Sequence, residues 1–110
     1  MRVLIDGLSE FYGERVRLVK TLMKREAEEE FPEVLKWALQ MLYFHGDGWL
    51  EICRIDNYPH ENQQGSHIHH YGKEEVRKVR MDFRDAEKAI KNISARILKE
   101  RFNETVRFEG

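Results

Sequence analysis

The chain has little cysteine and no long apolar run, and each shortage excludes a class of protein. Its single cysteine, Cys53, excludes an internal disulfide and a cysteine-based zinc cluster, and it favours a reducing compartment. No apolar stretch approaches the roughly eighteen residues of a membrane span, and Asp6 follows Met1 too closely for a signal peptide. We therefore expect a cytoplasmic protein with no membrane segment.

The sequence also lacks an excess of either charge, since 19 basic residues face 20 acidic ones for a formal net charge of -1. This balance excludes a general attraction to nucleic acid or to anionic membranes, so any such contact depends on local patches. Charged residues still make up 35% of the chain, against roughly 25% in ordinary soluble domains. Such a composition is typical of thermophile surfaces with ion-pair networks. At this length we expect one domain spanning residues 1–110.

Two glycines lie near the middle of the chain, where residues 45–48 (His-Gly-Asp-Gly) separate two runs rich in aromatic and β-branched side chains. This pattern predicts a β-hairpin with strands over residues 35–44 and 49–56. A helix that starts at Pro32 and continues through Tyr43 is the competing interpretation. Residues 15–24 fit a strand and a helix equally well, so periodicity leaves that segment open.

The clearest helical signal is near the C-terminus, where Ala86, Ile90, Ile93 and Ile97 recur at spacings of four, three and four. It predicts an amphipathic helix from about Asp85 to Phe102, with Asp85 capping its first turn. Residues 2–12 have apolar side chains at near-helical spacing before a glycine, which predicts a short N-terminal helix. Residues 76–83 alternate loosely and predict an edge strand.

Together these elements predict an α+β fold. We expect a small antiparallel sheet with a central β-hairpin, packed against the long C-terminal amphipathic helix and the short N-terminal helix. The physical reason is that a sheet with one apolar face must bury it against another element, and the long helix has an apolar stripe of matching length.

Four of the five histidines lie between residues 56 and 72, in one polar segment. Histidine donates a proton, accepts one or ligates a metal near neutral pH, so this segment is the first candidate for a chemical site. If residues 67–70 form a strand, alternation directs His67 and His69 to one face and Ile68 and His70 to the other. Two imidazoles would then share a site near Asp56, with Ile68 anchored in the core.

One chemistry for this site is RNA cleavage without a metal. A neutral imidazole at His67 or His69 would take the 2′-hydroxyl proton, and the protonated partner would assist the departing oxygen. Asp56 and Lys73 would assist the two histidines. The phosphate charge would be neutralised by basic residues that follow the segment, namely Lys73, Arg77 or Arg80.

Two other interpretations remain open on the residues alone. The His-x-His pair is a common metal-ligand geometry, so His60, His67 and His69 could hold zinc or another divalent transition metal with Asp56 or Glu61. In that case the His60–His70 loop would make the protein a non-enzymatic module that binds a metal or a protein partner. Alternatively, the histidines only hydrogen-bond the loop to itself or titrate at the surface.

The remaining aromatic, histidine and cysteine residues have structural interpretations. Cys53 lies mid-strand and is expected to be a buried, inert thiol. His45 is expected to face solvent in the hairpin turn. Trp37, Tyr43 and Trp49 lie on adjoining strands, where core positions or cross-strand pairs are more frequent than a base-stacking platform.

Basic residues outnumber acidic ones nine to four between positions 76 and 102. This excess predicts a phosphate-contacting face, with Arg77, Lys78 and Arg80 as the candidate RNA-binding residues. The competing interpretation is that it balances the acidic stretch over residues 26–33, within the molecule or across a homodimer.

The order of these features also resembles a known family. A strand pair closed by a glycine turn, the run Arg54-Ile55-Asp56-Asn57, the run Gly65-Ser66-His67-Ile68-His69-His70 and a terminal amphipathic helix are similar to the TumE-type toxin family, over about residues 37–100. The resemblance implies a growth-inhibiting toxin with a cognate antitoxin as its partner, which could use the basic face. The positions that carry over from the family motif are Asp56, Asn57, Gly65, His67 and His69.

Overall fold

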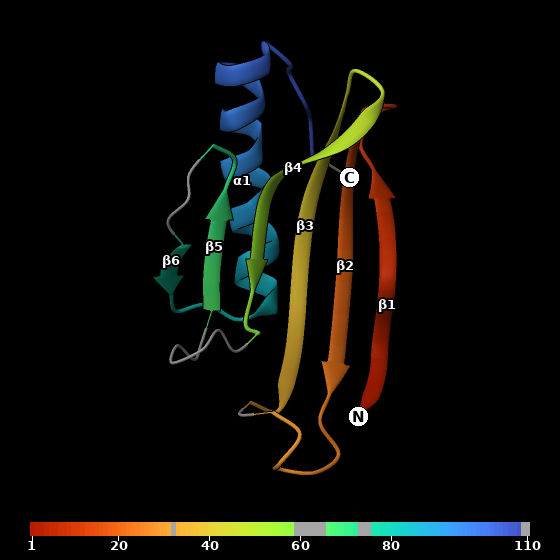
Figure 1. The fold of residues 1–110 in the computed structure, drawn as a ribbon, viewed down its shortest axis with the longest axis vertical. Helices are drawn as coiled ribbons and strands as arrows, with labels where there is room; N and C mark the ends of the chain where they lie inside the picture. The colour runs from red at the N-terminus through yellow and green to blue at the C-terminus, as the bar shows by residue number, and fades with distance from the viewer. Residues whose placement is uncertain (32, 59–65, 73–75, 109–110) are drawn as a thin grey trace.

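The computed structural model describes residues 1–31, 33–58, 66–72 and 76–108, and Figure 1 shows their arrangement. Six strands form one antiparallel sheet in the order β1-β2-β3-β4-β5-β6, so every strand pairs with its neighbours in sequence. The helix α1 lies across one face of this sheet and contacts β3 and β4. The elements are β1 (Arg2–Phe11), β2 (Val16–Lys24), β3 (Leu35–His45), β4 (Gly48–Asp56), β5 (Ser66–His70), β6 (Val76–Val79) and α1 (Phe83–Phe102).

The predicted N-terminal helix is wrong, because Arg2–Phe11 forms the edge strand β1. The pairing of β1 with β2 shifts register on both sides of Ile5, and Gly7 adopts a positive φ of 60°. Such bulges add residues to a strand and break strict alternation, so the apolar residues are spaced as in a helix although they lie on a strand. The α+β class itself holds, with one helix among the described residues and the sheet as the larger part.

The central hairpin is confirmed, and it settles two segments that the sequence left open. Residues 35–43 lie in β3, so the helix from Pro32 is not formed, and residues 16–24 form β2. Gly46 has a φ of 70°, whereas Asp47 has no positive φ. Positive φ at the first central residue alone is the pattern of a type II′ turn, which matches the right-handed twist of the paired strands.

The C-terminal helix is confirmed, but its cap is not the predicted one. Asp82 is the N-cap, and its side chain accepts a hydrogen bond of 2.8 Å from the backbone N–H of Asp85. At the other end Asn103 adopts the left-handed conformation, and its N–H donates to the carbonyl of Leu98. Within the described residues, no helix combines the length and the apolar composition needed to cross a membrane.

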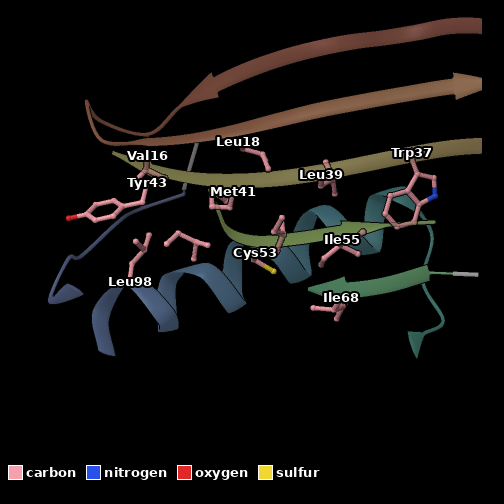
Figure 2. Packing of buried hydrophobic residues seen from close by; sticks show 13 residues of the cluster. Val16, Leu18, Trp37, Leu39, Met41, Tyr43, Cys53, Ile55, Ile68 and Leu98 are labelled. Carbon is pink, nitrogen blue, oxygen red and sulfur yellow. The ribbon is translucent and has the colours of Figure 1, made fainter. Parts of the chain in front are cut away.

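The core lies between α1 and the sheet, as Figure 2 shows. Trp37 and Tyr43 belong to it, as predicted, whereas Trp49 is 39% exposed and lies outside it. Cys53 is also in the core, where burial and the nearby charge of Glu51 raise the pKa of its thiol to about 12. The thiolate is therefore scarce at neutral pH, which agrees with an inert thiol. The core residues are Val16, Leu18, Trp37, Leu39, Met41, Tyr43, Ile52, Cys53, Ile55, Ile68, Ala86, Ile90 and Leu98.

The opposite side of the sheet has no helix over it among the described residues, and we call it the open face. Side chains alternate along a strand, so the neighbours of core residues point to this face. Ile52 is an extra residue in β4, because Met41 pairs with Cys53 while Leu42 pairs with Glu51. Because of this extra residue, side chains alternate between the two faces both before and after the bulge. Trp49, which precedes it, and Arg54 and Asp56, which follow it, therefore all point to the open face.

An ion-pair cluster joins the helix to the first two strands. Lys20 of β2 contacts Glu10 of β1, and its Nζ lies 2.9 Å from Oε2 of Glu87 in α1. Burial alone would lower the pKa of Lys20 and raise that of Glu87. Hydrogen bonds and charges reverse both shifts, from Glu10 and Glu87 in the case of Lys20 and from Lys20 and Lys91 in the case of Glu87. The pKa of Lys20 is raised from its ordinary value and that of Glu87 is lowered.

We therefore expect Glu87→Gln to reduce the free energy of unfolding at neutral pH by up to about 1 kcal/mol. A carboxylate with a lowered pKa contributes stability above its ordinary value of 4.5 and loses it as the pH falls through the folded pKa. The difference between variant and wild type should consequently shrink in acid. Urea unfolding at neutral pH and well below 4.5 would measure it, and a difference that stays constant with pH would contradict the assignment.

Candidate functional site

The candidate site lies where β4 and β5 pair on the open face. In this antiparallel register Arg54 is opposite His69, and Asp56 is opposite His67. Ile68 points to the other side of the sheet, where it is 1% exposed and belongs to the core, as predicted. Strand alternation therefore brings Arg54, Asp56, His67 and His69 together on one surface.

The carboxylate of Asp56 is the centre of this group. Its side chain is fully buried, and Oδ2 accepts a hydrogen bond of 2.8 Å from Nε of Arg54. The same oxygen lies 3.4 Å from Nε2 of His69, while Oδ1 accepts the backbone N–H of Tyr58 at 2.9 Å. A carboxylate held on both oxygens is a fixed acceptor, so it orients the side chain of Arg54 beside His69.

The position of His69 has a chemical consequence. Nε2 of His69 lies 3.4 Å from Oδ2 of Asp56, close enough for an ion pair when the imidazole is protonated. The His69 side chain is 26% exposed, so a substrate can reach it. A partly exposed histidine beside a carboxylate can take part in proton transfer.

His67 differs from His69 in its accessibility. It lies in register with Asp56 but is 0% exposed. A fully buried imidazole does not touch a substrate, so the structure does not present the two histidines as equal partners at a surface.

Three further residues belong to this region and were not singled out from the sequence. The Arg54 side chain is 26% exposed, and its guanidinium carbon lies 5.3 Å from the centre of the Tyr58 ring. Nζ of Lys36 lies 4.5 Å from the same ring. Burial raises the pKa of the Tyr58 hydroxyl, so this hydroxyl stays protonated and the side chain is neutral at neutral pH. Arg54 could have been found by strand alternation, since it precedes Asp56 by two residues.

Asn57 has a structural role. Its side-chain oxygen accepts the backbone N–H of Trp37 at 2.8 Å, and its amide nitrogen donates to the carbonyl of Leu35 at 2.7 Å and to Glu33 at 2.8 Å. These bonds tie the end of β4 to the start of β3. Bonds from an asparagine side chain to nearby backbone groups are typical of turns.

The predicted phosphate-binding residues lie at the neighbouring sheet edge. Lys78 is exposed on β6 in register with His67, and Arg80 is exposed just after this strand. Both line an open pocket of about 930 Å³ near the start of α1, together with Ser66, Met81 and acidic residues. His69 and Asp56 are not among the residues that line it. The side chain of Arg77 and the residue Lys73 lie outside the described part of the chain.

The metal alternative is not settled by the described residues. Among them, no group of three or more histidine, cysteine, aspartate or glutamate side chains is placed to hold a metal ion. Of the predicted ligands, His60 and Glu61 lie outside the described residues, as does Gly65 of the family motif. A zinc or other transition-metal site therefore stays a prediction.

The site thus consists of one partly exposed histidine and one partly exposed arginine beside a fully buried carboxylate. Comparisons of the chain with family models, with curated proteins and with solved structures found no match. The similarity to TumE-type toxins accordingly remains an inference from the motif around Asp56, His67 and His69.

Proposed function

We propose that this protein is a toxin-like ribonuclease of a toxin-antitoxin pair, which acts in the cytoplasm and cleaves RNA without a metal. One observation carries the proposal, namely that the partly exposed imidazole of His69 lies 3.4 Å from the buried carboxylate of Asp56, beside Arg54. An imidazole beside a carboxylate is suited to proton transfer, and a guanidinium beside it is suited to a phosphate. The cognate antitoxin would be the protein partner.

In the proposed reaction, the imidazole of His69 takes the proton of an RNA 2′-hydroxyl. The 2′-oxygen then bonds to the adjacent phosphorus, and the bond from phosphorus to the 5′-oxygen breaks. The departing 5′-oxygen takes a proton from water or from a lysine such as Lys78, and the products are a 2′,3′-cyclic phosphate and a 5′-hydroxyl. Arg54 contacts the phosphate, while Asp56 and His67 position the reacting groups.

Cleavage of RNA by the purified, tag-free protein in the presence of EDTA tests this proposal. We expect fragments that end in a 2′,3′-cyclic phosphate, which mass spectrometry identifies, and growth arrest when the protein is produced without its antitoxin. Intact RNA together with normal growth would contradict the ribonuclease. Cleavage that stops in EDTA and returns with a divalent metal would favour the metal site instead.

A further inference from the structure

We propose that the open face binds single-stranded RNA by stacking unpaired bases on Trp49 and Tyr58, in line with the His69 site. This inference rests on the proposed function, because it names the form of RNA that the same surface takes. Trp37 and Tyr43 are in the core and Trp49 forms a cross-strand pair with Phe44, as expected, but Trp49 is also accessible.

The first stacking position is an aromatic cluster at the start of β4. Trp49 is 39% exposed and Phe11 is 60% exposed. Their ring centres lie 6.4 Å apart, and Phe44 meets Trp49 edge-on at 5.4 Å. The Arg17 guanidinium carbon lies 4.5 Å from the centre of the Trp49 ring. An exposed indole with a cation against it is the combination that proteins use to stack a base next to a phosphate.

The second position lies at the other end of the same strand. The half-buried Tyr58 ring has Lys36 at 4.5 Å and Arg54 at 5.3 Å, so it too combines an aromatic ring with cations. Trp49 and Arg54 are five residues apart on an extended strand, a distance of about 16 Å. This spacing accommodates several nucleotides, and it places the scissile phosphate beside His69 when a base occupies Trp49.

The charge of the open face favours RNA over a second copy of the chain. Strand register places four basic side chains on this face among the described residues: Arg17, Lys36, Arg54 and Lys78. The acidic side chains that it places there are Glu51 and the buried Asp56. The face is therefore basic although the whole chain has a net charge of -1. A second copy would bring like charges together, whereas a phosphate backbone complements them.

Exposed aromatic rings also select the unpaired form of RNA. In a duplex the faces of the bases are covered by their neighbours, so sequence-tolerant stacking on protein side chains requires single strands. The exposed ring of Trp49 and the partly exposed side chains of Arg54 and His69 are available to contact such a strand.

Fluorescence anisotropy of a labelled single-stranded oligoribonucleotide tests the inference, with the same oligomer annealed to its complement as the duplex probe. The His69→Ala protein serves as the parent so that the probe is not cut. We expect Trp49→Ala in this background to weaken single-strand binding about tenfold, and Trp49→Phe to restore most of it. Leu8→Ala is the matched control, because Leu8 is 53% exposed but lies in register with Lys20 on the helix side of the sheet.

The outcomes separate this inference from the ribonuclease itself. Equal binding by the parent, Trp49→Ala and Leu8→Ala would overturn the inference, as would duplex binding as tight as single-strand binding. If light scattering shows that Trp49→Ala converts a dimer to a monomer while RNA binding is unchanged, the open face binds a second copy of the chain and the inference is overturned. Cleavage that depends on His69 but not on Trp49 would leave the proposed function standing alone. Binding that depends on Trp49 without any cleavage would support this inference and contradict the ribonuclease.

Discussion

The His69→Ala variant should cut RNA about 10²- to 10⁴-fold more slowly than the wild type while it keeps the native fold. The reason is that His69 is partly exposed and lies beside Asp56 and Arg54, so its loss removes the proposed base without opening the core. Single-turnover cleavage of an end-labelled RNA measures the effect, and circular dichroism and the melting temperature report on the fold.

A histidine elsewhere on the protein supplies the control for this experiment. His45 is exposed at the end of β3 and stacks on Tyr43, on the side of the sheet that faces α1. His45→Ala should therefore cut RNA at the wild-type rate. A folded His69→Ala protein with an unchanged rate would remove this residue from the reaction.

We expect the Asp56→Ala variant to be much less stable than the wild type. The variant leaves Nε of Arg54 and the backbone N–H of Tyr58 without their acceptor in a buried environment. Loss of a buried, charge-assisted partner of this kind costs about 2–4 kcal/mol, reduced here because the Arg54 side chain is partly exposed and can be rehydrated. For a chain of this size the melting temperature should fall by roughly 10–15 °C.

Two further variants serve as comparisons for the stability loss of Asp56→Ala. Asp56→Asn should recover only part of the loss, because an amide oxygen accepts from one of the two donors and its NH₂ group faces the other. Asp6→Ala, which removes an exposed carboxylate from β1, should change the free energy of unfolding by no more than about 0.5 kcal/mol. Urea unfolding of the three proteins makes the comparison, and an Asp56→Ala protein as stable as Asp6→Ala would show that the buried carboxylate does not hold the strands together.

The elements that were predicted correctly have signals within a few neighbouring residues. A glycine turn between two aromatic runs identified the central hairpin, and a four-three-four apolar repeat identified α1. Strand alternation also placed Ile68 in the core. These signals are local because turn geometry and helical periodicity are set by adjacent backbone dihedrals.

The first strand illustrates the opposite case. Its bulge at Asp6 and Gly7 removes the period of two, and only pairing with β2 shows that the segment is extended. The N-cap was misplaced for a related reason, because Asp82 and Asp85 are both acceptable caps and the backbone geometry selects Asp82.

By itself, the sequence determined the α+β class, the hairpin, the long helix and the residue types available for proton transfer. The tertiary structure alone decided that His69 is accessible while His67 is buried, that Arg54 shares the carboxylate of Asp56, and that Trp49 lies on the open face. These properties depend on the register between strands and on the layer that covers each face. Register and coverage are set by contacts between residues far apart in the chain, which no local pattern contains.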